Sequence, residues 1–415
     1  MENEANMENK NLKFVIVGHV DHGKSTLIGR LLYDTNSLAP DKIEEIKKFS
    51  DDLGRGTTEF AFLLDHLQEE RDQGITIDTA QTFFKTDKRE YVIIDAPGHV
   101  EFVKNMITGA SQAEAAILIV DAKEGVQEQT KRHAYILSLL GLNQIVVVLN
   151  KMDLLEYKEE VFEKVKEDTE KFLKSINVSA DCYIPIAALL GENIAKKSEK
   201  MEWYNGHTVL ESLDFLKTKS ISKEKSLIFA IQDVYKIDDK RIIAGRVETG
   251  EIKAGQKIKV LPSGQETEVI SVEKFNEKPE KAGPGENIGI ITKDPLFIEK
   301  GNIACDATSN HNSTDTFEAN VFWMSKEEIK KNEPIILKCA TQEVYAKIQE
   351  IKKRVNSSSL EVIEEDAEKL GNLEVGEVII KTDKPIVVDR FNNTQELGRF
   401  VLERNENTVA GGIII

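Results

Sequence analysis

The chain has 415 residues, of which 40% are hydrophobic and 31% charged, and its formal net charge is −17. This length predicts about two to four domains, and no apolar run approaches the ~20 residues of a membrane span, so we expect a globular protein without a membrane partner. The acidic balance disfavours a broad nucleic-acid-binding surface, while a polar, acidic segment 1–10 predicts a disordered tail rather than a signal peptide.

The first two elements in chain order are an apolar strand, residues 14–17, and a helix with an apolar face, residues 27–32. The residues that join them are Gly18, His19, Val20, Asp21, His22, Gly23, Lys24, Ser25 and Thr26. The pattern G-x-x-x-x-G-K-S in this context is typical of a phosphate-binding loop. We predict that Lys24 reaches the β- and γ-phosphates and that the Ser25 hydroxyl ligates Mg²⁺. A glycine-rich turn that binds nothing is the alternative, which the flanking elements disfavour.

Thr76 is the next candidate ligand for Mg²⁺ along the chain. A charged stretch, residues 65–73, leads through Gly74 into the β-branched run 75–77. A loop that reaches a γ-phosphate needs a hydroxyl for Mg²⁺ and an N–H for the phosphate, which Thr76 would supply. An ordinary strand residue is the alternative, and the motifs on either side favour the magnesium ligand.

Two strands follow, around residues 83–84 and 91–94, with a turn at 85–89. The second strand runs into Asp95, Ala96, Pro97, Gly98 and His99. An aspartate at the carboxyl end of a strand lies where α/β sheets bind ligands, so we expect Asp95 to hold Mg²⁺ through a water molecule. Gly98 lets a backbone N–H approach the γ-phosphate. His99 is predicted to be catalytic by positioning the attacking water, with an inert surface histidine as the alternative.

Two continuous apolar strands, 115–120 and 145–149, indicate a parallel sheet that is covered on both faces. A helix over 130–140, ended by Gly141, lies between them. The second strand ends at Asn150, Lys151, Met152 and Asp153. A carboxylate can accept hydrogen bonds from both N1–H and the exocyclic amine of guanine, whereas adenine offers no such pair of donors. The nucleotide is therefore predicted to be GTP.

A further helix is expected to bury Val161, Val165, Phe172 and Ile176 on one face. The strand 183–186 follows and runs into a second candidate loop for the base. That loop comprises Ala187, Ala188 and Leu189.

From Leu227 onward, short alternating runs are separated by glycine-rich turns about every ~10 residues, which indicates all-β barrels. The predicted fold is an α/β P-loop NTPase domain, with a mostly parallel sheet and helices on both faces, followed by two all-β barrel domains. The predicted bounds are 1–10 for the tail, 11–222 for the nucleotide domain, 223–312 for the first barrel and 313–415 for the second.

With these motifs in this order, the chain resembles the translation-factor class of GTPases over residues 12–415. The resemblance implies that Thr76 is the switch-one threonine and that Asp95, Gly98 and His99 form the switch-two motif with its catalytic histidine. Asn150, Lys151 and Asp153 match the guanine motif of that class. The last base motif usually begins with serine, so Ala187 implies the loss of a hydroxyl contact, with backbone contacts remaining.

Within this class the chain resembles the large, GTP-binding subunit of bacterial ATP sulfurylase, or sulfate adenylyltransferase. The stretches 65–78, 84–89 and 129–141 carry this resemblance. His22, Ala96, the stretch 285–289 and the C-terminal 396–400 resemble elongation factors instead.

The sulfurylase resemblance implies GTP and Mg²⁺ as cofactors and a cytoplasmic location. It also implies a small ATP-using catalytic subunit as partner, with GTP hydrolysis driving formation of adenylyl sulfate. The alternative is an elongation-factor-type carrier whose partners are aminoacyl-tRNA and the ribosome. Three widely spaced cysteines without metal-type spacing predict free thiols in a reducing compartment.

Overall fold

The computed structural model describes residues 11–38, 43, 80–96, 113–217, 225–237, 240–274 and 277–415. The chain divides into two compact units. The first is Met1–Thr218 with Ser357–Ser359, and the second is Lys219–Asn356 with Leu360–Ile415. No helix among the described residues is both long enough and apolar enough to cross a membrane.

The first unit is built on a six-stranded sheet in the order β2-β3-β1-β4-β5-β6. Its strands are β1 (Leu12–Gly18), β2 (Ala80–Lys85), β3 (Glu90–Asp95), β4 (Ala115–Asp121), β5 (Ile145–Asn150) and β6 (Cys182–Pro185). Only β2 runs antiparallel to its neighbour, and the other pairs are parallel. Because β4 and β5 are buried along their whole length, their continuous apolar sequence is explained by helices on both faces.

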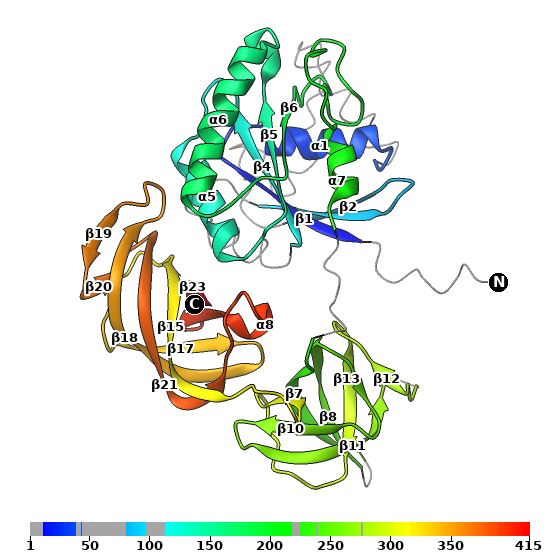
Figure 1. The fold of residues 1–415 in the computed structure, drawn as a ribbon, viewed down its shortest axis with the longest axis vertical. Helices are drawn as coiled ribbons and strands as arrows, with labels where there is room; N and C mark the ends of the chain where they lie inside the picture. The colour runs from blue at the N-terminus through cyan, green and yellow to red at the C-terminus, as the bar shows by residue number, and fades with distance from the viewer. Residues whose placement is uncertain are drawn as a thin grey trace, which may run out of the picture. The chain divides into compact units, whose positions relative to one another are not determined.

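Helices cover both faces of this sheet (Figure 1). They are α1 (Lys24–Asp34), α5 (Glu128–Leu139), α6 (Glu159–Ser175) and α7 (Val209–Phe215), with a short 3₁₀ turn η3 (Met152–Leu155). Side chains of α1 and α7 share one core with every second residue of the strands, including Phe14, Ile117 and Val148. The predicted parallel sheet with helices on both faces is confirmed.

The predicted face of α6 is partly wrong. The helix buries Phe162, Val165, Thr169 and Leu173. Val161 and Phe172 were expected to be buried, and both are only partly buried. The buried face of α6 is rotated around the helix so that it includes Phe162, whose ring lies 5.3 Å from the ring of Trp203. Trp203 is distant in sequence, so periodicity within the helix does not reveal this contact.

Local signals explain where two helices begin or end. Thr208 and Glu211 form a reciprocal capping box at the start of α7, which satisfies two backbone N–H groups of its first turn. Helix α5 ends just before Gly141, whose φ of 64° is a left-handed conformation that favours glycine.

The second unit begins with a closed barrel in the order β10-β11-β13-β8-β7-β14. Its strands are β7 (Ile228–Ile237), β8 (Lys240–Thr249), β10 (Lys257–Leu261), β11 (Gln265–Glu273), β13 (Asn287–Thr292) and β14 (Ile303–Asp306), with the short pair β9 (Ile252–Lys253) and β12 (Lys281–Ala282) beside it. Gly250, Gly264 and Gly285 have φ of 69°, 73° and 83°. The predicted glycine-rich turns therefore use the conformation that favours glycine.

The rest of this unit is a second set of antiparallel strands in the order β17-β22-β23-β15-β21-β18-β19, which the β17–β18 pairing closes. Its elements are β15 (Ser313–Trp323), β16 (Ile329–Lys330), β17 (Pro334–Cys339), β18 (Gln342–Asn356), β19 (Val362–Glu365), β20 (Lys369–Leu370), β21 (Glu374–Val387), α8 (Gln395–Gly398), β22 (Arg399–Arg404) and β23 (Asn407–Ile414). The predicted architecture of a nucleotide domain followed by two β-barrels is confirmed.

Candidate functional site

The loop between β1 and α1 is the centre of the candidate site. Two of its residues have positive φ, Asp21 at 62° and Gly23 at 96°. A Cβ atom at Gly23 would lie 2.3 Å from the Asn150 side-chain nitrogen, and one at Gly18 would lie 2.5 Å from Ile119. Both positions therefore need glycine, because the loop is packed tightly against the ends of β4 and β5.

The Lys24 ammonium lies inside this loop. Its Nζ donates hydrogen bonds to the carbonyl oxygens of Gly18 at 3.1 Å and His19 at 3.0 Å. Burial lowers the pKa of Lys24 to about 8, against the opposing effect of the nearby Asp95 and Asp21 carboxylates. The loop thus holds a desolvated cation, which phosphate oxygens would stabilise.

Oxygen groups that suit Mg²⁺ lie beside Lys24. Ser25 is in the first turn of α1, and Asp95 ends β3 with 2% exposure. A hydroxyl and a buried carboxylate are the hard oxygen donors that Mg²⁺ prefers, so these residues fit the cation.

Four predicted site residues lie outside the part of the chain that the structure describes. They are Thr76, Pro97, Gly98 and His99. Ala96, which directly precedes Pro97, is fully buried.

Asn150 joins three loops. Its side-chain nitrogen donates to the His22 carbonyl at 2.8 Å, and its side-chain oxygen accepts from the Ala188 N–H at 2.9 Å. The residue is 3% exposed. One amide therefore brings the phosphate loop, the end of β5 and the predicted second base loop together.

The residues after Asn150 form a tight turn. Lys151 has a φ of 64°, and its ammonium pairs with the Asp121 carboxylate at 2.7 Å. Met152 is fully buried and donates its N–H to the Ile186 carbonyl at 3.1 Å. Asp153 follows at the start of η3 and is partly exposed. Its carboxylate is thus accessible, while the backbone beneath it is anchored.

In the second base loop, Ala187 and Ala188 are buried and Leu189 is 36% exposed. The Ala187 carbonyl accepts from Gly191 at 2.9 Å, while the Ala188 N–H is used by Asn150. The loop is held by its backbone, so a side-chain hydroxyl at residue 187 is not needed for its shape.

Two buried histidines, one in the phosphate loop and one on α5, make contacts that the sequence did not predict. His22 Nδ1 accepts a hydrogen bond from the Asp121 N–H at 3.2 Å, and its Nε2 lies 3.4 Å from the Glu124 carboxylate. His133 of α5 is 1% exposed, and burial, with Lys24 and Arg132 nearby, lowers its pKa to about 3. The sequence signal for His133 was its place in the stretch 129–141, which carries the sulfurylase resemblance without assigning this histidine a role.

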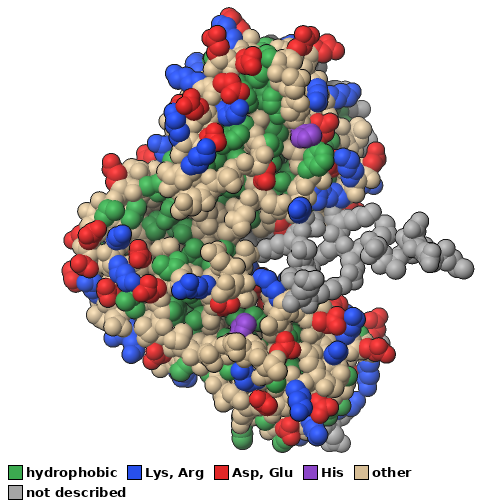
Figure 2. Space-filling view, viewed as in Figure 1, with side chains coloured by type: hydrophobic (Ala, Val, Ile, Leu, Met, Phe, Trp, Pro, Cys, Tyr) green, Lys and Arg blue, Asp and Glu red, His purple; other side chains and the backbone are tan. Residues whose placement is uncertain are grey.

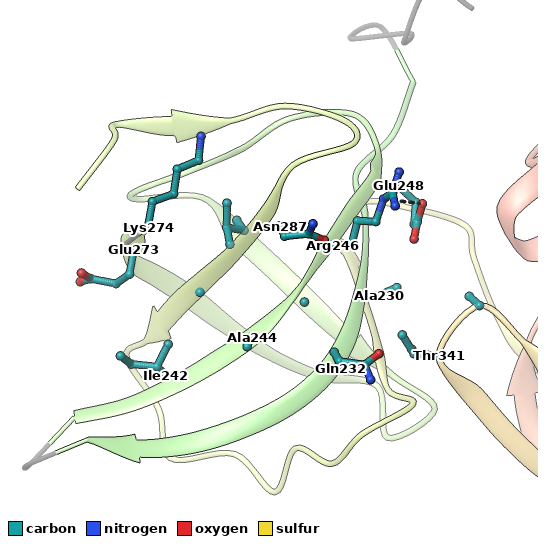
Figure 3. Close-up of a pocket in the computed structure, with 14 residues that line it drawn as sticks. Ala230, Gln232, Ile242, Ala244, Arg246, Glu248, Glu273, Lys274, Asn287 and Thr341 are labelled. Carbon is teal, nitrogen blue, oxygen red and sulfur yellow. Dashed lines mark ion pairs between the residues drawn. The ribbon is translucent and has the colours of Figure 1, made fainter. Parts of the chain in front are cut away.

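A separate cavity of about 720 Å³ opens on the first barrel of the second unit. Figure 3 shows its walls, which come mainly from β7, β8 and β13. Ala230, Ile242, Ala244 and Gly289 give it apolar surface, and Gln232, Arg246, Glu248, Glu273, Lys274 and Asn287 add polar groups. Arg246 pairs with Glu248 at 3.6 Å. Apolar surface with a few polar groups is typical of a small-molecule site.

Comparison with protein families matches residues 9–234 to the elongation factor Tu GTP binding domain. Residues 240–305 match elongation factor Tu domain 2, and residues 316–415 match the GTP-eEF1A C-terminal domain-like family.

Individual relatives fall into two groups. The chain is 40% identical to elongation factor 1-alpha of Methanopyrus kandleri, with 98% of each chain covered. It is 38% identical to elongation factor 1-alpha of Archaeoglobus fulgidus, again over 98% of both. It is also 38% identical to sulfate adenylyltransferase subunit 1 of Yersinia enterocolitica, over 97% of this chain and 85% of the relative.

Proposed function

The chain belongs to the translation-factor class of GTPases, and within this class we propose that it is the GTP-hydrolysing subunit of a two-subunit sulfate adenylyltransferase. In this role the chain couples GTP hydrolysis to the joining of ATP and sulfate by a separate catalytic subunit. The relative from Yersinia enterocolitica supports this assignment.

The observation that carries the proposal is the turn between β2 and β3, residues 84–89, which resembles the sulfurylase subunit. The turn is firmly anchored in the structure. Arg89 donates to the Leu216 carbonyl at 2.6 Å and also to Leu213, and Lys88 pairs with Asp214 at 2.9 Å. A turn fixed to α7 in this way presents a defined surface, which suits recognition of a protein partner.

The charge distribution also favours a protein partner. The net charge is −17, and Figure 2 shows acidic and basic side chains interspersed over the face in view. Binding of a nucleic-acid backbone gains its affinity from concentrated positive charge.

The chemistry proposed for the site is supported by the geometry of Lys24, Ser25 and Asp95, and by the sequence motifs at Thr76, Gly98 and His99. Lys24 and the loop N–H groups would bind the phosphates, Ser25, Thr76 and Asp95 would hold Mg²⁺, and Asp153 would select guanine. Mg²⁺ would neutralise charge on the β- and γ-phosphate oxygens. Gly98 gives an N–H access to the γ-phosphate, and His99 orients the attacking water.

A carrier of aminoacyl-tRNA to the ribosome is the second candidate. The cavity on the first barrel favours it, because a volume of about 720 Å³ with polar and apolar walls suits the end of a nucleic-acid ligand. The elongation factor 1-alpha relatives support it as well.

The deciding experiment co-expresses the chain with a small, ATP-using adenylyltransferase subunit. Pyrophosphate release from ATP and sulfate is measured with GTP and with a non-hydrolysable GTP analogue. The proposal expects sulfate-dependent release that requires GTP hydrolysis. Tight binding of aminoacyl-tRNA in the GTP state, without sulfate-dependent release, would overturn it in favour of the carrier.

A further inference from the structure

Two consecutive residues after the guanine motif have an unusual backbone. Glu156 and Tyr157 have φ of 54° and 57°. Residues with side chains rarely adopt this left-handed region, and such conformations persist where surrounding contacts impose them. They are also concentrated at functional sites. The turn that they form lies directly beyond η3, which carries Asp153.

Contacts from two directions hold this turn. The Tyr157 N–H donates to the Met152 carbonyl at 2.9 Å, which closes the turn onto the residue that precedes Asp153. The Trp203 indole N–H donates to the Tyr157 carbonyl at 2.9 Å. Since Met152 is also anchored to Ile186 at 3.1 Å, the backbone beneath Asp153 is fixed from both sides.

Lys200 connects the same turn to the second base loop. Its ammonium pairs with Glu192 at 3.0 Å, lies 3.3 Å from the Tyr157 hydroxyl and sits 5.1 Å from the centre of the Tyr157 ring. The Glu192 N–H in turn contacts the Ala187 carbonyl at 3.3 Å. One side chain therefore bridges both loops that are proposed to hold the base.

Residues 198–203, which we name the clamp, are themselves well anchored. The Ser198 N–H donates to Asn193 Oδ1 at 2.8 Å, and Asn193 donates to the Pro185 carbonyl at 2.9 Å. The Trp203 ring lies 5.3 Å from the Phe162 ring of α6. Because the clamp is attached to α6 and to β6, it can hold the base loops at a fixed position relative to these two elements.

We propose that the clamp sets the selectivity for guanine, with Trp203 and Lys200 as positioning residues that act through Glu156 and Tyr157. This inference rests on the proposed function, in which Asp153 accepts hydrogen bonds from the base. A carboxylate discriminates only if it is held at the position of the exocyclic amine. Loosening the turn should therefore weaken recognition of that amine more than contacts to the phosphates.

The test measures dissociation constants for GDP and for inosine diphosphate, which lacks the exocyclic amine. Trp203→Phe keeps an aromatic ring but removes the indole N–H. Loss of one hydrogen bond should lower GDP affinity by roughly 3- to 10-fold, with a smaller change for inosine diphosphate. Tyr204→Phe is the matched control, because its hydroxyl bonds Tyr183 and His207 rather than the base loops. The GDP preference should be unchanged in that control.

The proposal is overturned if Trp203→Phe weakens both nucleotides equally, since that is the result of a merely structural role. Lys200→Gln repeats the test at a side chain that is 51% exposed. A reduced GDP preference in that variant supports the clamp, and an unchanged preference overturns the role of Lys200.

Asp153→Asn separates failure of the clamp from failure of the base site. It should abolish the preference for GDP, and adding Trp203→Phe should then cause no further change in the ratio. Guanine preference retained in Asp153→Asn would overturn the assignment of the base site itself. If Asp153→Asn loses the preference for GDP while Trp203→Phe and Lys200→Gln both retain it, the proposed role of the clamp is overturned and the base site stands.

Discussion

Polar groups are distributed differently in the two units. In the first, Lys24, Asp95, Asp121 and Asn150 are all at most 8% exposed and lie at or just beyond the carboxyl ends of β1, β3, β4 and β5. In the second, oppositely charged side chains pair on the outside of strands, as Lys338 and Glu403 do at 2.6 Å. Strand direction explains the difference, because parallel strands bring equivalent ends to one edge. Antiparallel strands place their carboxyl ends alternately at opposite edges of a sheet. The cavity of the first barrel lies on the wall that its strands form.

The largest effect should come from His99, which the sequence places at the same edge but which lies outside the described residues. His99→Ala should slow GTP hydrolysis by roughly 10²- to 10⁴-fold, the effect of losing a group that positions or activates water. GTP affinity should change little. Single-turnover hydrolysis and nucleotide titration measure the two effects.

His207→Ala is a suitable control for His99, since His207 belongs to the same unit and its side chain is 56% exposed. Unchanged GTP turnover in His99→Ala would show that His99 has no role in hydrolysis.

Asn150→Ala tests whether buried amides differ between the units. It leaves the His22 carbonyl and the Ala188 N–H without their partner, which should cost about 2–4 kcal/mol in the free energy of unfolding and also weaken GTP binding. Gln342 is the matching residue in the second unit, because it donates to the Val387 carbonyl at 2.8 Å and accepts from the Val387 N–H at 2.7 Å. Gln342→Ala should cost similar stability without affecting GTP affinity. Denaturant unfolding and GTP titration check both, and equal losses of GTP affinity would contradict the comparison.

Lys24 gives a pH-dependent signal specific to the first unit. Its pKa of about 8 in the free protein is below the usual value, so a growing fraction is neutral as pH rises through 8. Phosphates favour the charged form, and GTP binding near pH 8.5 should therefore take up protons, with apparent affinity falling as pH rises. Calorimetry in buffers of different ionisation enthalpy measures this uptake. Absence of uptake between pH 7 and 9 would mean that Lys24 is already fully charged.

The smallest effect is expected at the partly exposed pair of Lys338 and Glu403 in the second unit. Lys338→Met should leave the denaturation midpoint, the GTP affinity and the proton uptake unchanged, because ion pairs that solvent can reach contribute little. A clear loss of stability would show that this pair, which is only partly exposed, contributes as the buried groups do.

The sequence predicted the fold class well because the two regions have different hydrophobic patterns. Continuous apolar strands indicated the covered parallel sheet, and alternating runs with regular glycine turns indicated the barrels. It was less successful for α6, where Phe162 rather than Val161 is buried. The predicted domain bounds and the roles of Thr76, Gly98 and His99 stay predictions.

The phosphate loop, the β2–β3 turn and the order of the predicted base motifs could be read from local sequence, because each depends on backbone requirements within a few residues. The contacts that hold them together become visible in the folded chain. Asn150 reaches His22 across 128 positions, and Trp203 reaches Tyr157 across 46. Such contacts form because strand order brings distant loops to one edge, where buried donors and acceptors must find partners. No local pattern in the sequence specifies which partners those are.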